Sequence, residues 1–531
     1  MLIEDFRKLY RATIQDASHG KLILLDAPTG SGKSYTVTQF LCERAQQDAN
    51  FKAFFVSDQK KNLPIDDFIN CWNQPTSKTS ASANRKIAVL RSLSDTVDRL
   101  LADWDNQHIP SLLAGDPAFK EALQNLKSQK KLYRLAVGLN SNLDHSKIIR
   151  PAEYQIRKVI TQILCQEANI KCGANGIDQE TQKQIRQYLI KNETPLSAWL
   201  SDVYPTINLS SYQIYILSTD KWIRSYQDFF KLGGVSFLFS PIIKDALVVF
   251  DEYDTTKQRL WNKAIDDALK IQVDLLPLFN ALYSGLSQVE AHAPGNLRAL
   301  LMSNQELANL LRGANELAAD FRLNFLYKVI GTSTVSNYVI HTPLDTIISA
   351  SRAWNSDFNA KAKIVEVSRT GQDELHFNWM LWRLSGFIRR VNRFVFIIAK
   401  RYMDQRNASG KFGTRVISLA DSVRSIYHAL GLETNQIEVL LQLATSDNQK
   451  LKKPRHAKQV LNQHREFQKR GIDLFWFNDS DQHDFQTEIN AVFFSITPEH
   501  YLLSLLQRCH VWGLSATAMF PTVIDNYDHA Y

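Results

Sequence analysis

The sequence predicts an α/β protein whose central sheet is mostly parallel, and three observations carry this prediction. An apolar run at residues 22–25 leads into a glycine-rich turn and then into the start of a helix. A second continuous apolar run, residues 246–250, is typical of a central parallel strand that is covered on both faces. Long stretches with leucines at helical spacing separate such runs. We therefore expect one sheet, interrupted by two large and mainly helical insertions.

The glycine-rich turn has the composition of a phosphate-binding loop, Ala27-Pro28-Thr29-Gly30-Ser31-Gly32-Lys33-Ser34. Its glycines let backbone N–H groups turn inward around a phosphate, and the following helix N-terminus favours negative charge. Lys33 can reach the terminal phosphates, and the Ser34 hydroxyl can ligate Mg²⁺. The alternative is a loop that merely contains glycines. Because the strand before it and the helix after it are the context that this motif requires, we interpret it as a nucleotide phosphate site.

Length and composition restrict the class of protein. With 531 residues the chain is long enough for about three or four domains. A hydrophobic content of 44% and a charged content of 22% are typical of globular proteins. The net charge of +8 suits a polyanionic partner without requiring one. The five cysteines are scattered without a C-x-x-C pair, so we expect free, reduced thiols.

The N-terminus carries charged residues where a secretory signal would need an apolar core. No segment approaches the ~20 apolar residues of a membrane span. We therefore expect a soluble, cytoplasmic protein without a membrane partner.

Along the chain, segments whose hydrophobic pattern is typical of strands alternate with segments whose pattern is typical of helices. After an opening helix at residues 3–17, the run 51–57 predicts a second strand, followed by a polar loop at residues 58–64. Open α/β sheets place their ligands at such loops. Residues 65–205 are mainly helical in pattern, for instance at 84–104 and 118–137. Their basic residues indicate a solvated helix face or, alternatively, a binding surface.

Strand texture returns at residues 213–218 and 235–239 and again before Asp251-Glu252-Tyr253-Asp254. Two carboxylates at the end of a buried strand are costly unless they have partners such as a metal ion and water. Asp251 would hold Mg²⁺, Glu252 would polarise the water that attacks the γ-phosphate, and Lys33 would offset the charge that develops. The alternative role for the two carboxylates is a strand-end cap.

The rest of the chain is again largely helical up to about residue 490. Leucines between Leu300 and Phe321 fall on one side of a helix, which indicates packing. The segments 382–402 and 450–470 are basic. They either contact a sugar-phosphate backbone or are explained by solubility or by acidic neighbours. The final part predicts a strand at 491–496, a helix at 499–506 and a run at 511–517 that ends in Ser515-Ala516-Thr517.

The segments APTGSGKS, DEYD and SAT resemble motifs I, II and III of the superfamily 2 helicases. Residues 54–64 lie where motif Ia would fall, and residues 217–221 resemble motif Ib. Large insertions on both sides of motif II are the arrangement of the XPD/DinG-like group. The resemblance implies a RecA-like ATP-binding domain of residues 1–64, 206–255 and 491–531, a helical insertion of residues 65–205 and an Arch-like helical insertion of residues 256–490.

What the resemblance implies about function is specific. The chain would be the N-terminal motor half of an ATP-dependent DNA helicase or translocase that uses ATP and Mg²⁺ and acts on single-stranded DNA. The residues that would contact nucleic acid are Ser57, Lys60, Lys61, Thr219 and Lys221, with Trp222, Arg224 and the segment 382–402 as further candidates. The residues that would couple ATP to strand contacts are Asp254, Ser515, Ala516 and Thr517.

Three departures from the group bear on these expectations. Asp254 stands where motif II usually has a histidine. The first insertion lacks the four thiolates of an iron–sulfur cluster, so no cluster is expected. The second RecA-like domain is expected outside this chain, in the rest of the protein or in trans, and hydrolysis without its arginines should be weak.

Two other functions remain open from the sequence. One is an ATP-gated nucleic-acid-binding or scaffold protein with little unwinding activity. The other keeps the motor but gives it RNA as its substrate.

Overall fold

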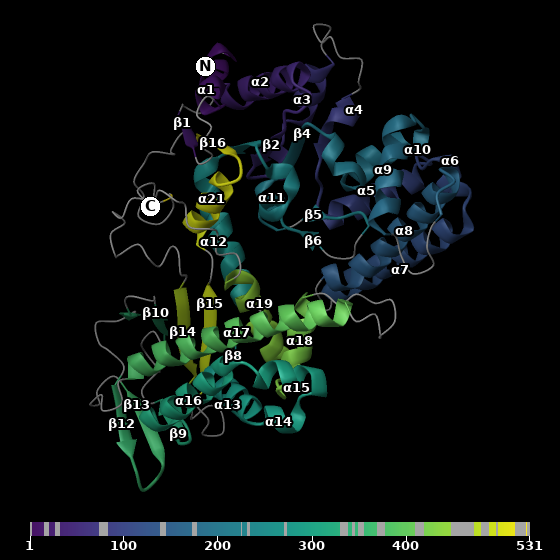
Figure 1. Ribbon diagram of the computed structural model, residues 1–531. Coiled ribbons are helices and arrows are strands. Elements are labelled where there is room, and N and C mark those ends of the chain that lie inside the picture. The colour runs from purple at the N-terminus through teal and green to yellow at the C-terminus, as the bar shows by residue number, and fades with distance from the viewer. Residues whose placement is uncertain are drawn as a thin grey trace. The chain divides into compact units, whose positions relative to one another are not determined.

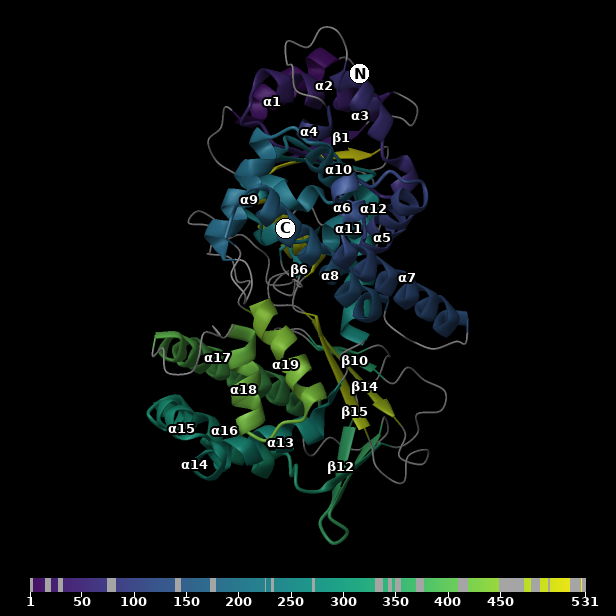
Figure 2. The same cartoon turned by 90° about the vertical axis from the view of Figure 1, so that its right-hand side faces the viewer.

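A computed structural model describes residues 3–14, 21–26, 32–73, 83–138, 145–171, 178–224, 226–230, 234–269, 273–329, 338–341, 346–348, 355–368, 377–408, 419–447, 472–478, 488–494, 497–515 and 527. The chain divides into two compact units (Figure 1; Figure 2). Unit 1 is Met1–Leu260 with Leu502–Asp528, and unit 2 is Trp261–Tyr501 with His529–Tyr531. Each unit combines helices with β-sheet, so the protein is of mixed α/β class.

Unit 1 is built on a six-stranded sheet with the order β1-β16-β7-β2-β4-β3. Every pair of neighbouring strands in it is parallel, as the sequence predicts for its central part. The strands are β1 (Leu22–Asp26), β2 (Ala53–Ser57), β3 (Ile87–Val89), β4 (Ile214–Ser218), β7 (Leu247–Asp251) and β16 (His510–Ser515). A separate hairpin pairs β5 (Tyr226–Gln227) with β6 (Gly234–Val235).

Side chains from helices cover both faces of this sheet, which explains its continuous apolar strands. On one face, Phe40 of helix α2 (Lys33–Gln47) stacks on Trp512 of β16, with ring centroids 5.5 Å apart. On the other face, Trp222 of helix α11 (Thr219–Ile223) packs edge-on against Phe54 of β2, with centroids 5.5 Å apart. Trp222 is 1% exposed. The expectation that Trp222 contacts nucleic acid is therefore wrong for this structure, because the indole belongs to the core.

The helices of unit 1 include two that lie partly in unit 2, α12 and α21. They are α1 (Ile3–Ile14), α2 (Lys33–Gln47), α3 (Ile65–Trp72), α4 (Ala83–Lys86), α5 (Leu93–Asp105), α6 (Ser111–Gly115), α7 (Pro117–Gly138), α8 (His145–Glu167), α9 (Gln179–Lys191), α10 (Pro195–Val203), α11 (Thr219–Ile223), α12 (Tyr253–Leu269) and α21 (Pro498–Leu506). Short 3₁₀ turns are η1 (Lys60–Asn62), η2 (Pro205–Ser211), η3 (Phe237–Phe239) and η4 (Pro241–Ile243).

Helices α5 to α10 share a hydrophobic core of their own, which includes Leu100, Ile156 and Trp199. The predicted helical texture of residues 65–205 is present, with one difference. Strand β3 comes from this range and pairs with β4, so the helix expected across 84–104 is wrong at residues 87–89. The strand expected at 235–239 is largely a 3₁₀ turn, because Phe237 turns inward to stack on Trp222.

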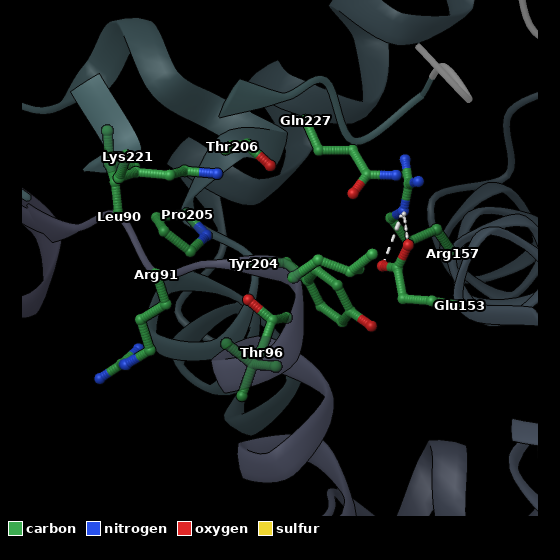
Figure 3. A pocket seen from close by; sticks show the side chains of 12 residues that line it. Leu90, Arg91, Thr96, Glu153, Arg157, Tyr204, Pro205, Thr206, Lys221 and Gln227 are labelled. Carbon is green, nitrogen blue, oxygen red and sulfur yellow. Dashed lines mark hydrogen bonds and ion pairs between the residues drawn. The ribbon is translucent and has the colours of Figure 1, made fainter. Parts of the chain in front are cut away.

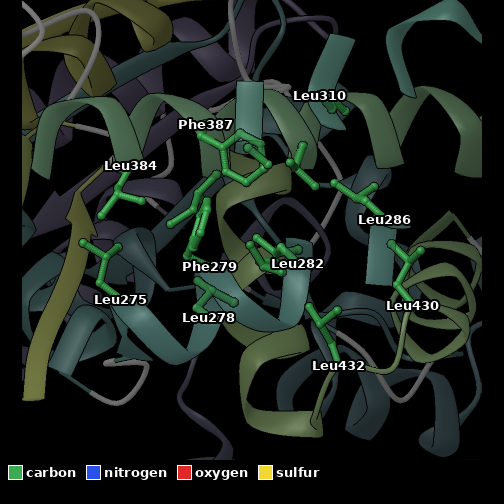
Figure 4. Close-up of a cluster of buried hydrophobic side chains, with 14 of the residues drawn as sticks. Leu275, Leu278, Phe279, Leu282, Leu286, Leu310, Leu384, Phe387, Leu430 and Leu432 are labelled. Carbon is green, nitrogen blue, oxygen red and sulfur yellow. The ribbon is translucent and has the colours of Figure 1, made fainter. Parts of the chain in front are cut away.

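Unit 2 contains helices around a leucine- and phenylalanine-rich core together with two sheets (Figure 4). Its helices are α13 (Leu275–Ser287), α14 (Val289–His292), α15 (Gly295–Met302), α16 (Gln305–Asp320), α17 (Phe377–Ala408), α18 (Leu419–Ala429) and α19 (Thr434–Asp447). Its strands are β8 (Val273–Asp274), β9 (Leu326–Val329), β10 (Tyr338–His341), β11 (Thr346–Ile348), β12 (Asn355–Asn359), β13 (Ile364–Ser368), β14 (Ile472–Asn478) and β15 (Glu488–Phe494). The sheet orders are β11-β10-β14-β15-β8 and β12-β13-β9.

Two expectations about this part of the chain need correction. The strand expected at 491–496 was assigned to the ATP-binding domain, but β15 pairs with β14 and β8 inside unit 2. Its inward residues, such as Ile489 and Ala491, are buried in the core of unit 2. The single helix expected from Leu300 to Phe321 is two helices, because the Asn304 side chain accepts a hydrogen bond from the Glu306 N–H and starts α16 there.

We expect Gly513→Ala to destabilise unit 1 by about 1–3 kcal/mol, the usual cost of overpacking. A Cβ at Gly513 would lie 2.7 Å from Cγ of the buried Tyr253 and 2.9 Å from Cδ2 of Leu24. Gly115→Ala is the matched control, since a Cβ there meets nothing within 4 Å. Chemical denaturation of the two variants measures the difference, and equal stabilities would contradict the packing of β16 described here.

Candidate functional site

The strand ends of the six-stranded sheet form one row of residues at its carboxyl edge. In the parallel register Asp26 pairs with Ser515, Asp251 pairs with Ser57, and Ser57 pairs with Ser218. Strand β16 lies between β1 and β7, so the segment that ends at Ser515 separates the other two motif strands. Residues that are hundreds of positions apart in sequence therefore meet at the edge where open α/β sheets bind ligands.

The start of helix α2 lies at this edge. Gly32 caps the helix with φ 76° and ψ 18°, a left-handed conformation that glycine adopts without steric cost. The helix has no side-chain hydrogen bond at its N-cap. The first turn is closed by Thr36, whose N–H and hydroxyl both donate to the Gly32 carbonyl at 2.9 Å. Ala27, Pro28, Thr29, Gly30 and Ser31 lie outside the described residues, so the loop itself stays a prediction.

Ser34 and Asp251 are in direct contact. The Ser34 hydroxyl donates a hydrogen bond of 3.0 Å to Oδ1 of Asp251, which joins the first turn of α2 to the end of β7. Burial raises the pKa of Asp251 above its ordinary value, although the Ser34 hydrogen bond and the charge of Lys33 both act to lower it. The Asp251 carboxylate is therefore short of positive charge in this structure and favours a cationic partner.

Glu252 lies in the turn between β7 and α12 and is exposed. Its φ of 59° is left-handed, which costs a residue with a side chain about 1–2 kcal/mol. Such conformations persist where the surrounding structure enforces them, often at functional sites. Burial raises the pKa of Glu252, and the negative charges of Asp251 and Asp254 raise it further, whereas Lys33 lowers it. A raised pKa brings a carboxylate closer to the range of a general base at neutral pH.

Helix α12 is fixed to the neighbouring loop by an ion pair that the sequence did not indicate. Arg259 Nε donates to Oδ1 of Asp58 at 2.9 Å, and Asp58 directly follows β2. Asp254 lies in the first turn of α12, where a carboxylate is favoured by the helix dipole. Tyr253 stacks on Tyr527 with centroids 4.8 Å apart. The turn that carries Asp251 and Glu252 is therefore held from several sides.

The predicted coupling and strand-contact residues have different environments. Ser515 is buried at the end of β16, and Ala516 and Thr517 lie outside the described residues. Ser57 and Thr219 are both 0% exposed, so neither hydroxyl is available at the surface for a strand contact. Lys61 is exposed and Lys60 forms an ion pair of 2.6 Å with Asp95. The side chain of the fifth residue, Lys221, lines a cavity.

Helix α17 carries the aromatic and basic segment 382–402. Trp379 and Trp382 are 45% and 42% exposed. Arg383 lies 3.8 Å from Asp320, and Arg390 lies 3.2 Å from Glu306. Acidic neighbours thus neutralise part of this basic segment, as the alternative of acidic neighbours anticipates. The second basic segment, residues 450–470, lies outside the described residues.

Other groups in the chain bear on cofactors and redox state. Cys42, Cys71 and Cys509 are free thiols, whereas Cys165 is disulfide-bonded, so the expectation of reduced cysteines is wrong at Cys165.

Within the described ranges, no group of three or more His, Cys, Asp or Glu side chains is arranged to hold a metal ion. Each helix in the described part of the chain is too short or too polar to cross a membrane.

Comparison with known proteins identifies no family for this chain, so any function must be inferred from the sequence motifs and the geometry of the site. The chain matches no protein-family model, and no curated protein matches it significantly in sequence.

We expect Asp251→Asn to raise the stability of the nucleotide-free protein at pH 7. A carboxyl group whose pKa is raised by folding binds its proton more tightly in the native state, so stability falls as pH rises above the ordinary value of 3.8. The neutral amide of Asn removes this loss of stability at high pH, and its oxygen still accepts a hydrogen bond from the Ser34 hydroxyl. The gain should shrink as pH is lowered toward 3.8.

The matched control is Asp58→Asn, which breaks the ion pair with Arg259 and should lower stability at pH 7. Thermal unfolding between pH 4 and 8 measures both variants. A loss of stability at pH 7 in Asp251→Asn would show that its carboxylate is already well compensated.

Proposed function

We propose that unit 1 is a RecA-like ATP-binding domain and that the chain is the N-terminal motor half of an ATP-dependent DNA helicase or translocase. The group it resembles is the XPD/DinG-like branch of superfamily 2. The observation that carries this proposal is the 3.0 Å contact between Ser34 and Asp251, which are 217 positions apart. It joins a residue of the phosphate-loop motif to the first carboxylate of the DEYD segment, as a shared nucleotide site requires.

The donor set at this contact fits Mg²⁺. The Ser34 hydroxyl and the Asp251 carboxylate are oxygen ligands of the type that Mg²⁺ prefers, and the buried carboxylate favours a cation. The lack of a cluster of three or more metal-binding side chains in the described residues is no obstacle, because Mg²⁺ at such sites takes its remaining ligands from phosphates and water. When bound with ATP, the ion would neutralise negative charge on the β- and γ-phosphates.

Different residues of the chain would then bind the phosphates, offset the developing charge and activate the attacking water. Backbone N–H groups at the start of α2 bind phosphate oxygens, aided by the helix dipole. Lys33 offsets charge that moves toward the leaving oxygen, and its charge already acts on both Asp251 and Glu252. Glu252 orients the attacking water and accepts its proton, a role that suits its exposure and raised pKa.

We expect Lys33→Ala to abolish ATP binding, because the phosphates lose their only flexible cation in this motif. Glu252→Gln should leave binding intact and reduce turnover by about 10²–10⁴-fold, the typical contribution of a general base. Titration with a fluorescent ATP analogue and a phosphate-release assay separate the two effects. A Glu252→Gln protein with full turnover would exclude Glu252 as the base.

We propose that contacts within unit 1 would link the nucleotide site to a loop that binds nucleic acid. Asp251 and Glu252 adjoin α12, and Arg259 of α12 holds Asp58 in the loop that also carries the exposed Lys61. Movement of α12 during the ATP cycle would therefore shift this loop. We propose that a second RecA-like domain, in the same protein or in trans, supplies the arginines that complete hydrolysis.

Adding single-stranded DNA should raise ATP turnover several-fold in protein that is completed by the second domain. Titrations with single-stranded DNA, RNA and duplex DNA of equal length measure this stimulation. Stronger stimulation by RNA would favour the RNA-helicase alternative. An ATP turnover rate that none of the three polymers changes would contradict the helicase proposal and favour the ATP-gated scaffold protein.

A further inference from the structure

A cavity with about 40 Å³ of room lies in unit 1, among residues of the helical insertion, α11 and β5 (Figure 3). It is lined by Leu90, Arg91, Leu93, Thr96, Glu153, Arg157, Val203, Tyr204, Pro205, Thr206, Lys221 and Gln227. Lys221 follows β4, which β16, β7 and β2 separate from the phosphate-loop strand β1. Strand β7, which carries Asp251, is two strands from β4, or roughly 10 Å at about 4.8 Å per strand, and no residue of the phosphate loop or the DEYD segment lines the cavity, so it is distinct from the nucleotide site.

Two hydrogen-bond donors of the cavity lack acceptors. Nε2 of Gln227 is buried without a hydrogen-bond partner in the described structure. The Lys221 side chain extends toward the wall that carries Arg157 and Glu153, as Figure 3 shows, and it forms no ion pair with any described residue. A buried donor without an acceptor destabilises the folded state, and water, an ion or a ligand usually satisfies it.

The acidic side chain that lines the cavity, Glu153, already has a partner. The buried Glu153 carboxylate accepts two hydrogen bonds from Arg157 Nε, at 2.9 and 3.1 Å. Arg157 also donates to the carbonyls of Asp228 and Phe229, at 2.7 and 2.6 Å. Because Glu153 is paired with Arg157, its carboxylate compensates the positive charge of Lys221 only in part.

The charges around Lys221 favour an anion in the cavity. Burial lowers the pKa of Lys221 to about 8, and the positive Arg150 acts in the same direction, whereas Asp95 and Glu153 oppose it. Asp95 is itself paired with Lys60. Arg91 at the cavity wall points away and binds Asp202 through its side chain at 3.2 Å.

We propose that this cavity binds a phosphate group, held by the Lys221 ammonium and the Gln227 amide, with the hydroxyls of Thr96 and Thr206 beside it. Water needs about 10–15 Å³ of such room per molecule, so the cavity accommodates one tetrahedral oxyanion but not a nucleoside. The phosphate is either free in solution or the terminal phosphate of a nucleic-acid strand. This proposal does not depend on nucleotide hydrolysis by the chain.

The test measures protection of Lys221 from an amine-acylating reagent at pH 8, read by peptide mass spectrometry with inorganic phosphate as the probe. The Lys33→Ala variant is used so that the phosphate loop does not compete. Since the free fraction falls as 1/(1 + [L]/Kd), acylation of Lys221 should slow by roughly tenfold at ten times the Kd. The exposed Lys244 of the same unit should react at an unchanged rate.

A second variant keeps the lysine and removes the site. Gln227→Glu places a negative charge in the cavity and should abolish the protection by phosphate. Gln155→Glu adds the same charge at an exposed position of α8 and should leave the protection intact. Protection that persists in Gln227→Glu would overturn the assignment to this cavity.

Two oligonucleotides distinguish the sources of the phosphate. A single strand with a 5′-phosphate that protects Lys221, where the same strand with a 5′-hydroxyl does not, identifies a strand end as the ligand. Protection by inorganic phosphate alone identifies a free-phosphate site. If neither form of phosphate slows acylation of Lys221 more than an equal ionic strength of chloride does, the proposal fails.

Discussion

The parallel alignment of the six-stranded sheet is the constraint on which the candidate site depends. Parallel strands place all their carboxyl ends at one edge, where the register pairs Asp26 with Ser515, Leu514 with Asp251, Asp251 with Ser57, and Ser57 with Ser218. The hydrogen bond from Ser34 to Asp251 is a consequence of this alignment. A register shift of β7 by one residue would turn Asp251 to the opposite face of the sheet and remove the contact.

The edge also concentrates unfavourable electrostatics. Asp251, Glu252 and Asp254 lie within four positions at the end of a buried strand, and burial raises the pKa of the first two. Glu252 additionally has a left-handed backbone. The contacts around α12, such as the ion pair between Arg259 and Asp58, hold this turn in place. Strain and uncompensated charge of this kind are expected where a protein is arranged for a ligand and not for maximal stability.

Basic residues in this chain have different roles that their sequence spacing does not reveal. Lys60 and Lys221 both follow strands at the same sheet edge, yet Lys60 pairs with Asp95 at the surface and Lys221 enters a cavity. The cavity walls come from residues between Leu90 and Gln227, on helices and turns that only the packing of the insertion brings together. A basic residue after a strand is therefore only a candidate for contact with nucleic acid, because its packing neighbours decide whether its charge is paired, buried or exposed.

The sequence by itself determined the strands and the helix starts near the motifs, because glycine turns and continuous apolar runs are local signals. It also indicated Lys33, Ser34, Asp251 and Glu252 as one chemical group. Tertiary structure alone decided that β3 joins the sheet, that β15 belongs to unit 2, and that Trp222 and Thr219 are buried. The physical reason is that the partners of a strand and the burial of a side chain depend on which distant parts of the chain pack against them. A local apolar run does not specify those parts.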